Sequence, residues 1–294
     1  MKRILALHGV GSSASILKEQ LTPLQRELGS WFEFVYLNGA IERERGPGMA
    51  ASYPGPFHCY TAGYAPADIR DTLDDLDDFI QENGPFDGVF GFSQGASIAA
   101  SYILDYQLHN PEGPPPFDFA VLFSSVAAFS AETGYCAGPV AELVANPAVT
   151  RHFPAGDFSK LQGPKARLLV EYLALSYRVA RTIGAVTSDN DLAFFADGGM
   201  PDQIPRPLHP ALTPHRVRIP TVHITGKADL PDMIAQSRRV RELCDQNLVR
   251  VHEHSGGHSI PGRRQDVKAI AESIEWAMNE GCYRRAVHRA MGKF

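Results

Sequence analysis

The chain has 294 residues, of which 44% are apolar and 21% are charged, and its formal net charge is −5. This is ordinary globular composition, and it excludes a disordered chain, a collagen and a coiled coil. Because a net negative chain repels phosphate, its composition gives no case for a nucleic-acid partner. No apolar run approaches the ~20 residues of a membrane span, so we expect no such span.

The N-terminal segment Met1–Gly9 is basic and then apolar, as a secretory signal is. Its apolar part is shorter than the about 7–15 residues that such a signal needs, so a first buried strand is the better interpretation. The four cysteines are scattered, without a C-x-x-C pair. This usage is typical of a reducing compartment, and we expect a cytoplasmic protein.

Short apolar runs alternate with helix-length amphipathic segments, which predicts an α/β fold with a mostly parallel, doubly wound sheet. An amphipathic helix is expected over Ala67–Asn83, and its many acidic residues are interpreted as a solvated face rather than a metal site. The expected strands are Arg3–Leu7, Glu33–Leu37, Gly88–Phe92, Phe119–Phe123, Thr221–Thr225 and Leu248–Glu253.

The alternation stops between Ala127 and Pro214, where we expect no buried strand. Lys165–Ile183 has one broad apolar helical face, and a proline-rich stretch follows it. We therefore predict a core of residues 1–126 and 215–294 with an insertion at 127–214. We interpret the insertion as a helical and proline-rich lid or cap; the alternative is a solvent-facing elaboration without a role at a site.

The most informative stretch is the G-x-S-x-G sequence Gly91–Gly95, which follows an expected strand and precedes a helix start rich in small residues. In a nucleophile elbow, the serine lies on a sharp strand-to-helix turn that needs small neighbours. The turn also places the hydroxyl near a helix N-terminus, which favours developing negative charge. The sequence therefore predicts Ser93 as a nucleophile.

A serine nucleophile needs a base and a group that orients the base, and after a nucleophile elbow the chain order is serine, acid, histidine. Asp229 follows the expected strand Thr221–Thr225, and His258 lies in a glycine-rich loop after Leu248–Glu253. We assign His258 as general base and then acid, and Asp229 as the carboxylate that fixes the imidazole tautomer. Asp232 is the alternative acid, although its place after Pro231 suits the first turn of a helix.

An oxyanion needs two N–H donors, one from the residue after the nucleophile and one from a loop after an early strand. The expected donors are the backbone N–H groups of Gln94 and Val10. We expect His8 to hold the Val10 loop rather than to act as a base. The pair Gly9 and Gly11 lacks the third glycine of a dinucleotide-binding fingerprint, which excludes that interpretation.

A zinc site is the alternative for the histidines after the last expected strand. His252, His254 and His258 form an H-x-H-x₃-H pattern, and the first two share one face of a strand. Because the serine–histidine–aspartate assignment explains His258 without a metal, we expect neither a metal nor a cofactor.

Taken together, these segments resemble the fungal-type serine hydrolase (FSH) family, whose relatives include stand-alone thioesterases of fungal polyketide gene clusters. Two features depart from the family pattern: the long insertion at 127–214, and Ser124-Ser125, where the family tends to have a glycine. The matching segments are Ile4–Gly9, Gly91–Gly95, Gly226–Asp229 and Gly257–Pro261, with Pro47-Gly48 and the aromatic stretch Tyr53–Tyr60.

The resemblance implies an α/β-hydrolase fold and hydrolysis of an acyl ester or thioester. By analogy it implies release of a polyketide acyl chain from an acyl-carrier protein, with a small-molecule acyl substrate. Release by water gives an acid and release by a hydroxyl of the chain gives a lactone; we favour hydrolysis. Aromatic residues expected at the mouth of an acyl site are Phe57, Tyr60, Phe194 and Phe195.

Three alternatives remain open. The first alternative is a general carboxylesterase that acts on small or medium oxygen esters, the second is a peptidase, and the third is a non-catalytic binding module of the same fold. A non-catalytic module would lack one of the serine, histidine and aspartate residues assigned above, or would have an altered oxyanion loop. An acidic carrier-protein partner would need a basic patch such as Arg263-Arg264 or Arg284-Arg285, although arginines at a surface often have no partner.

Overall fold

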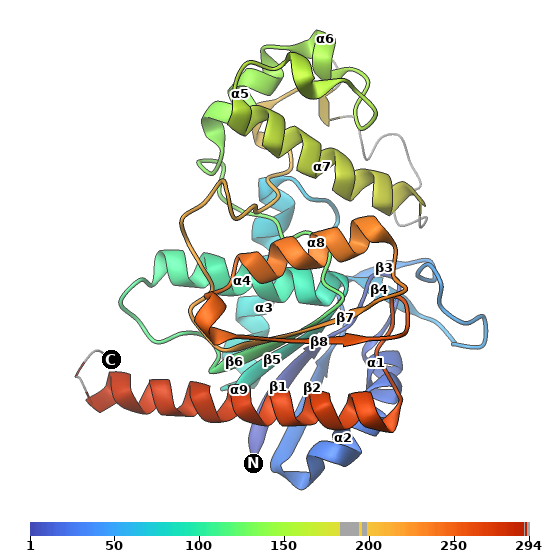
Figure 1. Ribbon diagram of the computed structural model, residues 1–294, viewed down its shortest axis with the longest axis vertical. Coiled ribbons are helices and arrows are strands. Elements are labelled where there is room, and N and C mark those ends of the chain that lie inside the picture. The colour runs from blue at the N-terminus through green and yellow to red at the C-terminus, as the bar shows by residue number, and fades with distance from the viewer. Residues whose placement is uncertain (183–193, 196–198, 291, 293–294) are drawn as a thin grey trace.

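The computed structural model describes residues 1–182, 194–195, 199–290 and 292. A six-stranded parallel sheet with the order β2-β1-β5-β6-β7-β8 forms its centre (Figure 1). All six expected strands are present within one residue at either end. Their bounds are β1 (Lys2–Leu7), β2 (Phe32–Leu37), β5 (Gly88–Phe92), β6 (Phe119–Phe123), β7 (Thr221–Gly226) and β8 (Val249–His254).

Helices cover both faces of this sheet, which confirms the α/β class. Helices α1 (Ala14–Gln20), α2 (Thr22–Leu28) and α9 (Arg264–Ala290) lie on one face, and α3 (Pro66–Asn83), α4 (Gln94–His109) and α8 (Pro231–Glu242) lie on the other (Figure 1). Each face of the sheet has its own hydrophobic core. Because side chains alternate along a strand, Ile4 and Ala6 of β1 pack into the core beneath α1, α2 and α9, whereas Leu5 and Leu7 pack into the core beneath α3, α4 and α8.

Two further strands were not expected from the sequence. β3 (Ile41–Arg43) and β4 (Phe57–Cys59) form a separate antiparallel pair. Each has three residues, too few to show a period of two. The N–H of Gly11 donates to the carbonyl of His58 at 2.9 Å, so this pair is attached to the loop after β1.

Between β6 and β7, the described part of the chain contains helices and loops but no strand of either sheet. Helices α5 (Ala137–Val144), α6 (Pro147–Thr150) and α7 (Pro164–Thr182) form a layer outside α4 and α8, and α7 packs on α8 (Figure 1). The expected helix end at Ile183 lies outside the described residues.

Short 3₁₀ turns occur at Gly29–Trp31, Phe158–Lys160, Pro201–Gln203 and Gln246–Leu248. All four cysteines are free thiols. No helix within the described residues is both long enough and apolar enough to span a bilayer.

Candidate active site

The order of the strands determines where a site can form. The chain passes from β1 to β2 on one side and later adds β5 on the other side of β1. Crevices at such a switch point, outside the carboxyl ends of parallel strands, are where α/β sheets bind ligands. The loops after β1 and β5 meet at this point, and the loops after β7 and β8 open at the same edge.

Ser93 lies on a strained turn between β5 and α4. It has φ 54° and ψ −113°, a positive φ that is uncommon for a residue with a side chain. Its N–H donates to the carbonyl of Phe123 at 2.9 Å, and its own carbonyl accepts from Ala96 and Ser97. Strain of this kind costs about 1–3 kcal/mol and persists only where neighbouring bonds hold it.

Two glycines make this turn possible. A Cβ on Gly91 would lie 2.4 Å from the Cα of Ala96, and a Cβ on Gly95 would lie 2.3 Å from the carbonyl oxygen of Leu7. Contacts under 3.0 Å do not occur for real Cβ atoms. The glycines of the G-x-S-x-G sequence are therefore required by the close approach of β1, β5 and α4.

The structure brings Ser93, His258 and Asp229 into one hydrogen-bonded chain. The Nε2 of His258 lies 2.9 Å from the Oγ of Ser93, and its Nδ1 lies 2.7 Å from the Oδ2 of Asp229. The Asp229 side chain is 3% exposed, whereas that of His258 is 25% exposed. This is the arrangement that activates a serine nucleophile: a buried carboxylate contacts a partly exposed imidazole, which contacts the hydroxyl.

The acid in contact with His258 is Asp229 and not Asp232, which lies in the first turn of α8. The other oxygen of Asp229 accepts the N–H of Leu230 at 2.8 Å, which fixes the carboxylate. The loop that carries Asp229 lies close to the loop that carries His258. A Cβ on Gly226 would be only 2.1 Å from the carbonyl oxygen of Gly257, so this close approach requires a glycine.

Val10 and Gln94, whose N–H groups are the expected oxyanion donors, belong to the same part of the structure as Ser93. Both residues line one pocket with Ser93, and neither N–H donates to a backbone carbonyl of the described residues. Gln94 is the first residue of α4, where helical N–H groups lack an intrahelical partner. The Val10 loop is fixed at Gly11, which has φ +64° and whose carbonyl accepts from Gly46 at 2.8 Å.

His8 holds this loop, and Tyr60 holds His8. The Nδ1–H of His8 donates to the carbonyl of Gly9 at 2.7 Å, and its Nε2 accepts the N–H of Gly39 at 3.1 Å. Burial lowers the pKa of His8 to about 4. The hydroxyl of Tyr60 accepts the N–H of His8 and donates to the carbonyl of Leu37. With both ring nitrogens engaged, His8 cannot serve as a base for Ser93.

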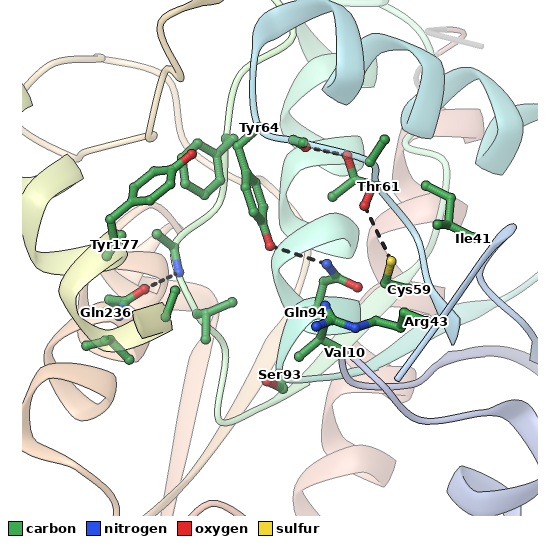
Figure 2. A pocket seen from close by; sticks show the side chains of 18 residues that line it. Val10, Ile41, Arg43, Cys59, Thr61, Tyr64, Ser93, Gln94, Tyr177 and Gln236 are labelled. Carbon is green, nitrogen blue, oxygen red and sulfur yellow. Dashed lines mark hydrogen bonds between the residues drawn. The ribbon is translucent and has the colours of Figure 1, made fainter. Parts of the chain in front are cut away.

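A pocket of about 310 Å³ opens beside Ser93 (Figure 2). Such a volume lies at the small end of the ligand-site range. Arg43 is its one charged lining residue among those that the structure describes. The remaining walls come from the β3–β4 region, the loop after β6, α7 and α8, and include Ile41, Cys59, Thr61, Tyr64, Val126, Phe129, Tyr177, Val179, Ala180 and Gln236.

None of the four aromatic residues expected at the mouth lines this pocket. Tyr60 is engaged with His8, and Phe57 packs under the guanidinium of Arg45, 5.3 Å from the ring centre. Phe194 and Phe195 pack against Phe153, with ring centres 5.2 and 5.3 Å apart. Among the residues that the structure describes, the aromatic ones that line the pocket are Tyr64, Phe129 and Tyr177.

The histidines of the alternative zinc pattern contact separate partners. His252 pairs with Asp266 at 2.9 Å, and the Nδ1 of His254 accepts the N–H of Gly256 at 3.1 Å. His258 contacts Asp229 and Ser93, so the three rings do not converge. A different cluster, Asp105, His109 and Glu132, has ligand atoms within 4.8 Å, but Arg70 is hydrogen-bonded to both of its carboxylates.

Ser124, where the resemblance led us to expect a glycine, lies on a turn with a positive φ. Ser124 has φ 43°, the left-handed region in which glycine is the least strained residue. Its N–H donates to the carbonyl of Ile224 at 2.8 Å, so the turn after β6 is held by β7. This chain therefore places a serine where the backbone favours glycine.

The α/β fold and a serine at a strand-to-helix turn, with its Oγ 2.9 Å from the Nε2 of His258, are typical of a serine hydrolase. The model of the serine hydrolase (FSH1) family matches residues 1–270, and the chain belongs to that family. It is 43% identical to esterase alnB of Emericella nidulans, over 95% of this chain and 97% of that one. It is 30% identical to serine hydrolase cnsH of Penicillium expansum, over 78% and 93%. Among solved structures, a carboxylesterase of Bacillus cereus aligns with TM-score 0.48 and 15% identity, over 94% and 88%.

Proposed function

We propose that the chain cleaves acyl thioesters through an acyl-enzyme on Ser93. The observation that carries the proposal is the unbroken chain of contacts Ser93–His258–Asp229, at 2.9 and 2.7 Å. His258 takes the serine proton as Ser93 attacks the carbonyl, and then gives that proton to the leaving thiolate. Asp229 stabilises the imidazolium and keeps Nε2 directed at the serine.

The N–H groups of Val10 and Gln94 hold the negative oxygen of the tetrahedral intermediate. Both residues line the pocket with Ser93, and Gln94 begins α4, where the helix dipole adds to the stabilisation. Preorganised donors of this kind contribute about 2.7–4 kcal/mol each to catalysis. The side chain of Gln94 fixes its own backbone, since its oxygen accepts from Tyr60 and its nitrogen donates to Tyr64.

The insertion at 127–214 serves as a cap over the acyl group. Ser176, Tyr177, Val179 and Ala180 of α7 form one wall of the pocket that contains Ser93. A wall from the insertion excludes water from the acyl-enzyme, which raises the chance that a hydroxyl of the acyl chain attacks instead. Hydrolysis remains our favoured second step.

The acyl donor is a polyketide chain on a carrier protein, by analogy with the thioesterases that the family includes. Arg263 and Arg264 are exposed next to the His258 loop and provide a local positive surface for an acidic carrier. Arg284 and Arg285 instead pair with Glu280 and Asp118. The second candidate is a general carboxylesterase, which the name of the relative esterase alnB favours. The free thiols suit the cytoplasm that we propose as its location.

Matched substrates test the reaction type. Thioesters of N-acetylcysteamine and ethyl esters of the same acyl groups are compared by kcat/KM, and the products are identified as acid or lactone. A thioester preference of tenfold or more supports the thioesterase. A preference for the oxygen esters would favour the carboxylesterase. No turnover of either series would refute both candidates.

A further inference from the structure

Tyr60 contacts both of the segments that carry the expected oxyanion donors. Its hydroxyl accepts the N–H of His8 at 2.8 Å, and its backbone N–H donates to the side-chain oxygen of Gln94 at 3.2 Å. His8 lies in the same loop as Val10, directly after β1, and Gln94 begins α4. One residue therefore joins the two sides of the proposed oxyanion hole.

We propose that Tyr60 is a positioning residue that sets the separation and direction of the two oxyanion donors, the N–H groups of Val10 and Gln94. This inference rests on the proposed function, because it takes those two N–H groups to hold the oxyanion. Catalysis by fixed donors depends on a geometry that exists before the reaction, and a misplacement of about 1 Å can cost about 10²-fold in rate. A side chain that ties both donor segments together maintains that geometry.

The three polar groups of Tyr60 are all engaged, which fixes the residue in place. Its hydroxyl accepts from His8 and also donates to the carbonyl of Leu37 at 2.9 Å, and its own carbonyl accepts from the hydroxyl of Thr72 at 3.2 Å. The residue is 7% exposed, and burial raises the pKa of its hydroxyl, which therefore keeps its proton at neutral pH. Tyr60 thus connects the end of β2 and helix α3 to the two donor segments.

The small β3–β4 pair gives Tyr60 its place in the fold. Tyr60 directly follows β4, and the N–H of Gly11 donates to the carbonyl of His58 in that strand at 2.9 Å. A Cβ on Gly39 would lie 2.8 Å from the backbone nitrogen of Tyr60, so the loop after β2 packs directly against this segment. Backbone contacts therefore fix Tyr60 relative to the loop after β1, in addition to the contact of its side chain.

Tyr64 holds the other end of the Gln94 amide (Figure 2). The Nε2 of Gln94 donates to the hydroxyl of Tyr64 at 3.3 Å, so Tyr60 and Tyr64 together engage both ends of this side chain. Because Gln94 is 3% exposed, the loss of a partner would leave a buried polar group unpaired. We expect Tyr64 to contribute to the same positioning, but only on the side of Gln94.

Tyr60→Phe tests the proposal, because it removes the hydroxyl and keeps the ring and the backbone N–H. The buried N–H of His8 then loses its partner, and the loop that carries Val10 can shift. We expect kcat to fall by at least tenfold while KM stays within threefold, which is the pattern of an interaction made only in the transition state. The factor should be the same for acetyl and octanoyl groups, as oxygen esters and as thioesters, because each of them forms the oxyanion.

An inhibitor gives a second readout of the donors. The carbonyl carbon of an alkyl trifluoromethyl ketone forms a bond with the Oγ of Ser93 while the serine proton passes to His258, and the ketone oxygen becomes an oxyanion. Its inhibition constant should rise at least tenfold in Tyr60→Phe, because the same two donors stabilise this adduct.

Tyr102→Phe is the matched control. Tyr102 is also buried and its hydroxyl donates to Asp77 at 2.5 Å, but it does not line the pocket with Ser93. Urea unfolding should show a loss of stability in both phenylalanine variants, whereas kcat in Tyr102→Phe should stay within threefold of the wild type. If Tyr60→Phe does not fold, Tyr64→Phe takes its place and should lower kcat by at least threefold at an unchanged KM; a smaller loss there would overturn the proposal.

The outcomes separate this role from the alternatives and from the proposed function. An effect on KM that grows with the length of the acyl chain would show that Tyr60 contacts the substrate instead, and would overturn the positioning role. A loss of kcat below tenfold in Tyr60→Phe, or an equal loss in Tyr102→Phe, would also overturn it. These results leave the proposed function intact as long as the wild type cleaves the substrates and Ser93→Ala does not. If the wild type cleaves none of them, the proposed function itself fails.

Discussion

Gly95 lies so close to Leu7 that a Cβ on the glycine would be 2.3 Å from the carbonyl oxygen of Leu7. The N–H of Gly95 donates to the neighbouring carbonyl of His8 at 3.1 Å. This contact joins the start of α4 to the end of β1. It therefore holds together the two segments that carry Ser93 and Val10, and it links the stability of the fold to the geometry of the site.

Replacing Gly95 with alanine should destabilise the protein and reduce its activity together. Overpacking a tight contact costs about 1–3 kcal/mol, and here backbone atoms must move. Urea unfolding gives the free energy, and ester turnover gives the activity. Gly138→Ala is the control, because nothing lies within 4 Å of its Cβ and it lies in α5. The control should be neutral or stabilising by up to about 1 kcal/mol. Equal effects at both positions would contradict the role of the close contact.

Asp229→Asn should reduce kcat by about 10⁴-fold, as in serine proteases, because the amide cannot stabilise the imidazolium and favours the wrong tautomer. Asp232→Asn is the matched control, since Asp232 lies in the first turn of α8 and not against His258. It should lose less than tenfold. Steady-state kinetics on one ester gives kcat for both variants. A loss below tenfold in Asp229→Asn would show that another residue is the acid.

The apolar wall from α7 should control the length of the acyl chain that is accepted. Ala180→Trp places a large ring in the pocket and should raise KM for long acyl chains by at least tenfold while acetyl esters change little. Glu171→Trp adds the same ring to an exposed position of α7 and should have no length-dependent effect. If both variants, or both chain lengths, respond alike, α7 does not act as the proposed cap.

Stability should fall in acid partly through His8. Burial lowers its pKa from 6.5 to about 4, so between these values the unfolded state binds the proton and the folded state does not. The contribution is present in full above pH 6.5 and is lost as the pH falls toward 4, by at most about 3 kcal/mol. His209, His223 and His254 also have lowered pKa values, so the wild type alone does not isolate the effect.

The isolating experiment compares His8→Gln with the wild type. Urea unfolding at several pH values should give the variant a lower stability at pH 7 and a smaller further loss between pH 6.5 and 4. Parallel losses in the two proteins over this range would show that His8 does not titrate as the structure indicates.

The sheet and the three residues of the proposed triad were predictable from the sequence because each has a local signal. The strands are short apolar runs, and Ser93 lies in a glycine-flanked turn whose glycines are sterically required. Asp229 and His258 follow strands whose carboxyl ends meet at one edge. Periodicity and chain order were therefore sufficient for these elements.

The walls of the pocket had no such signal. β3 and β4 have three residues each, so nothing in the sequence pattern placed Arg43 or Cys59 beside Ser93. The aromatic residues expected at the mouth were chosen for their chemistry, but the hydroxyl of Tyr60 is used to hold His8, and Phe194 and Phe195 pack against Phe153. Side-chain partners distant in sequence decide such positions, and a single sequence does not contain them.

In the proposed mechanism, Ser93 carries the acyl group during turnover. Intact-protein mass spectrometry after mixing with acyl N-acetylcysteamine thioesters tests it directly, with wild type and Ser93→Ala side by side. We expect the wild type to gain the mass of the acyl group and a peptide containing Ser93 to carry it, while the variant gains nothing. An adduct of equal yield in Ser93→Ala, or turnover that the variant retains within tenfold, would show that Ser93 is not the nucleophile.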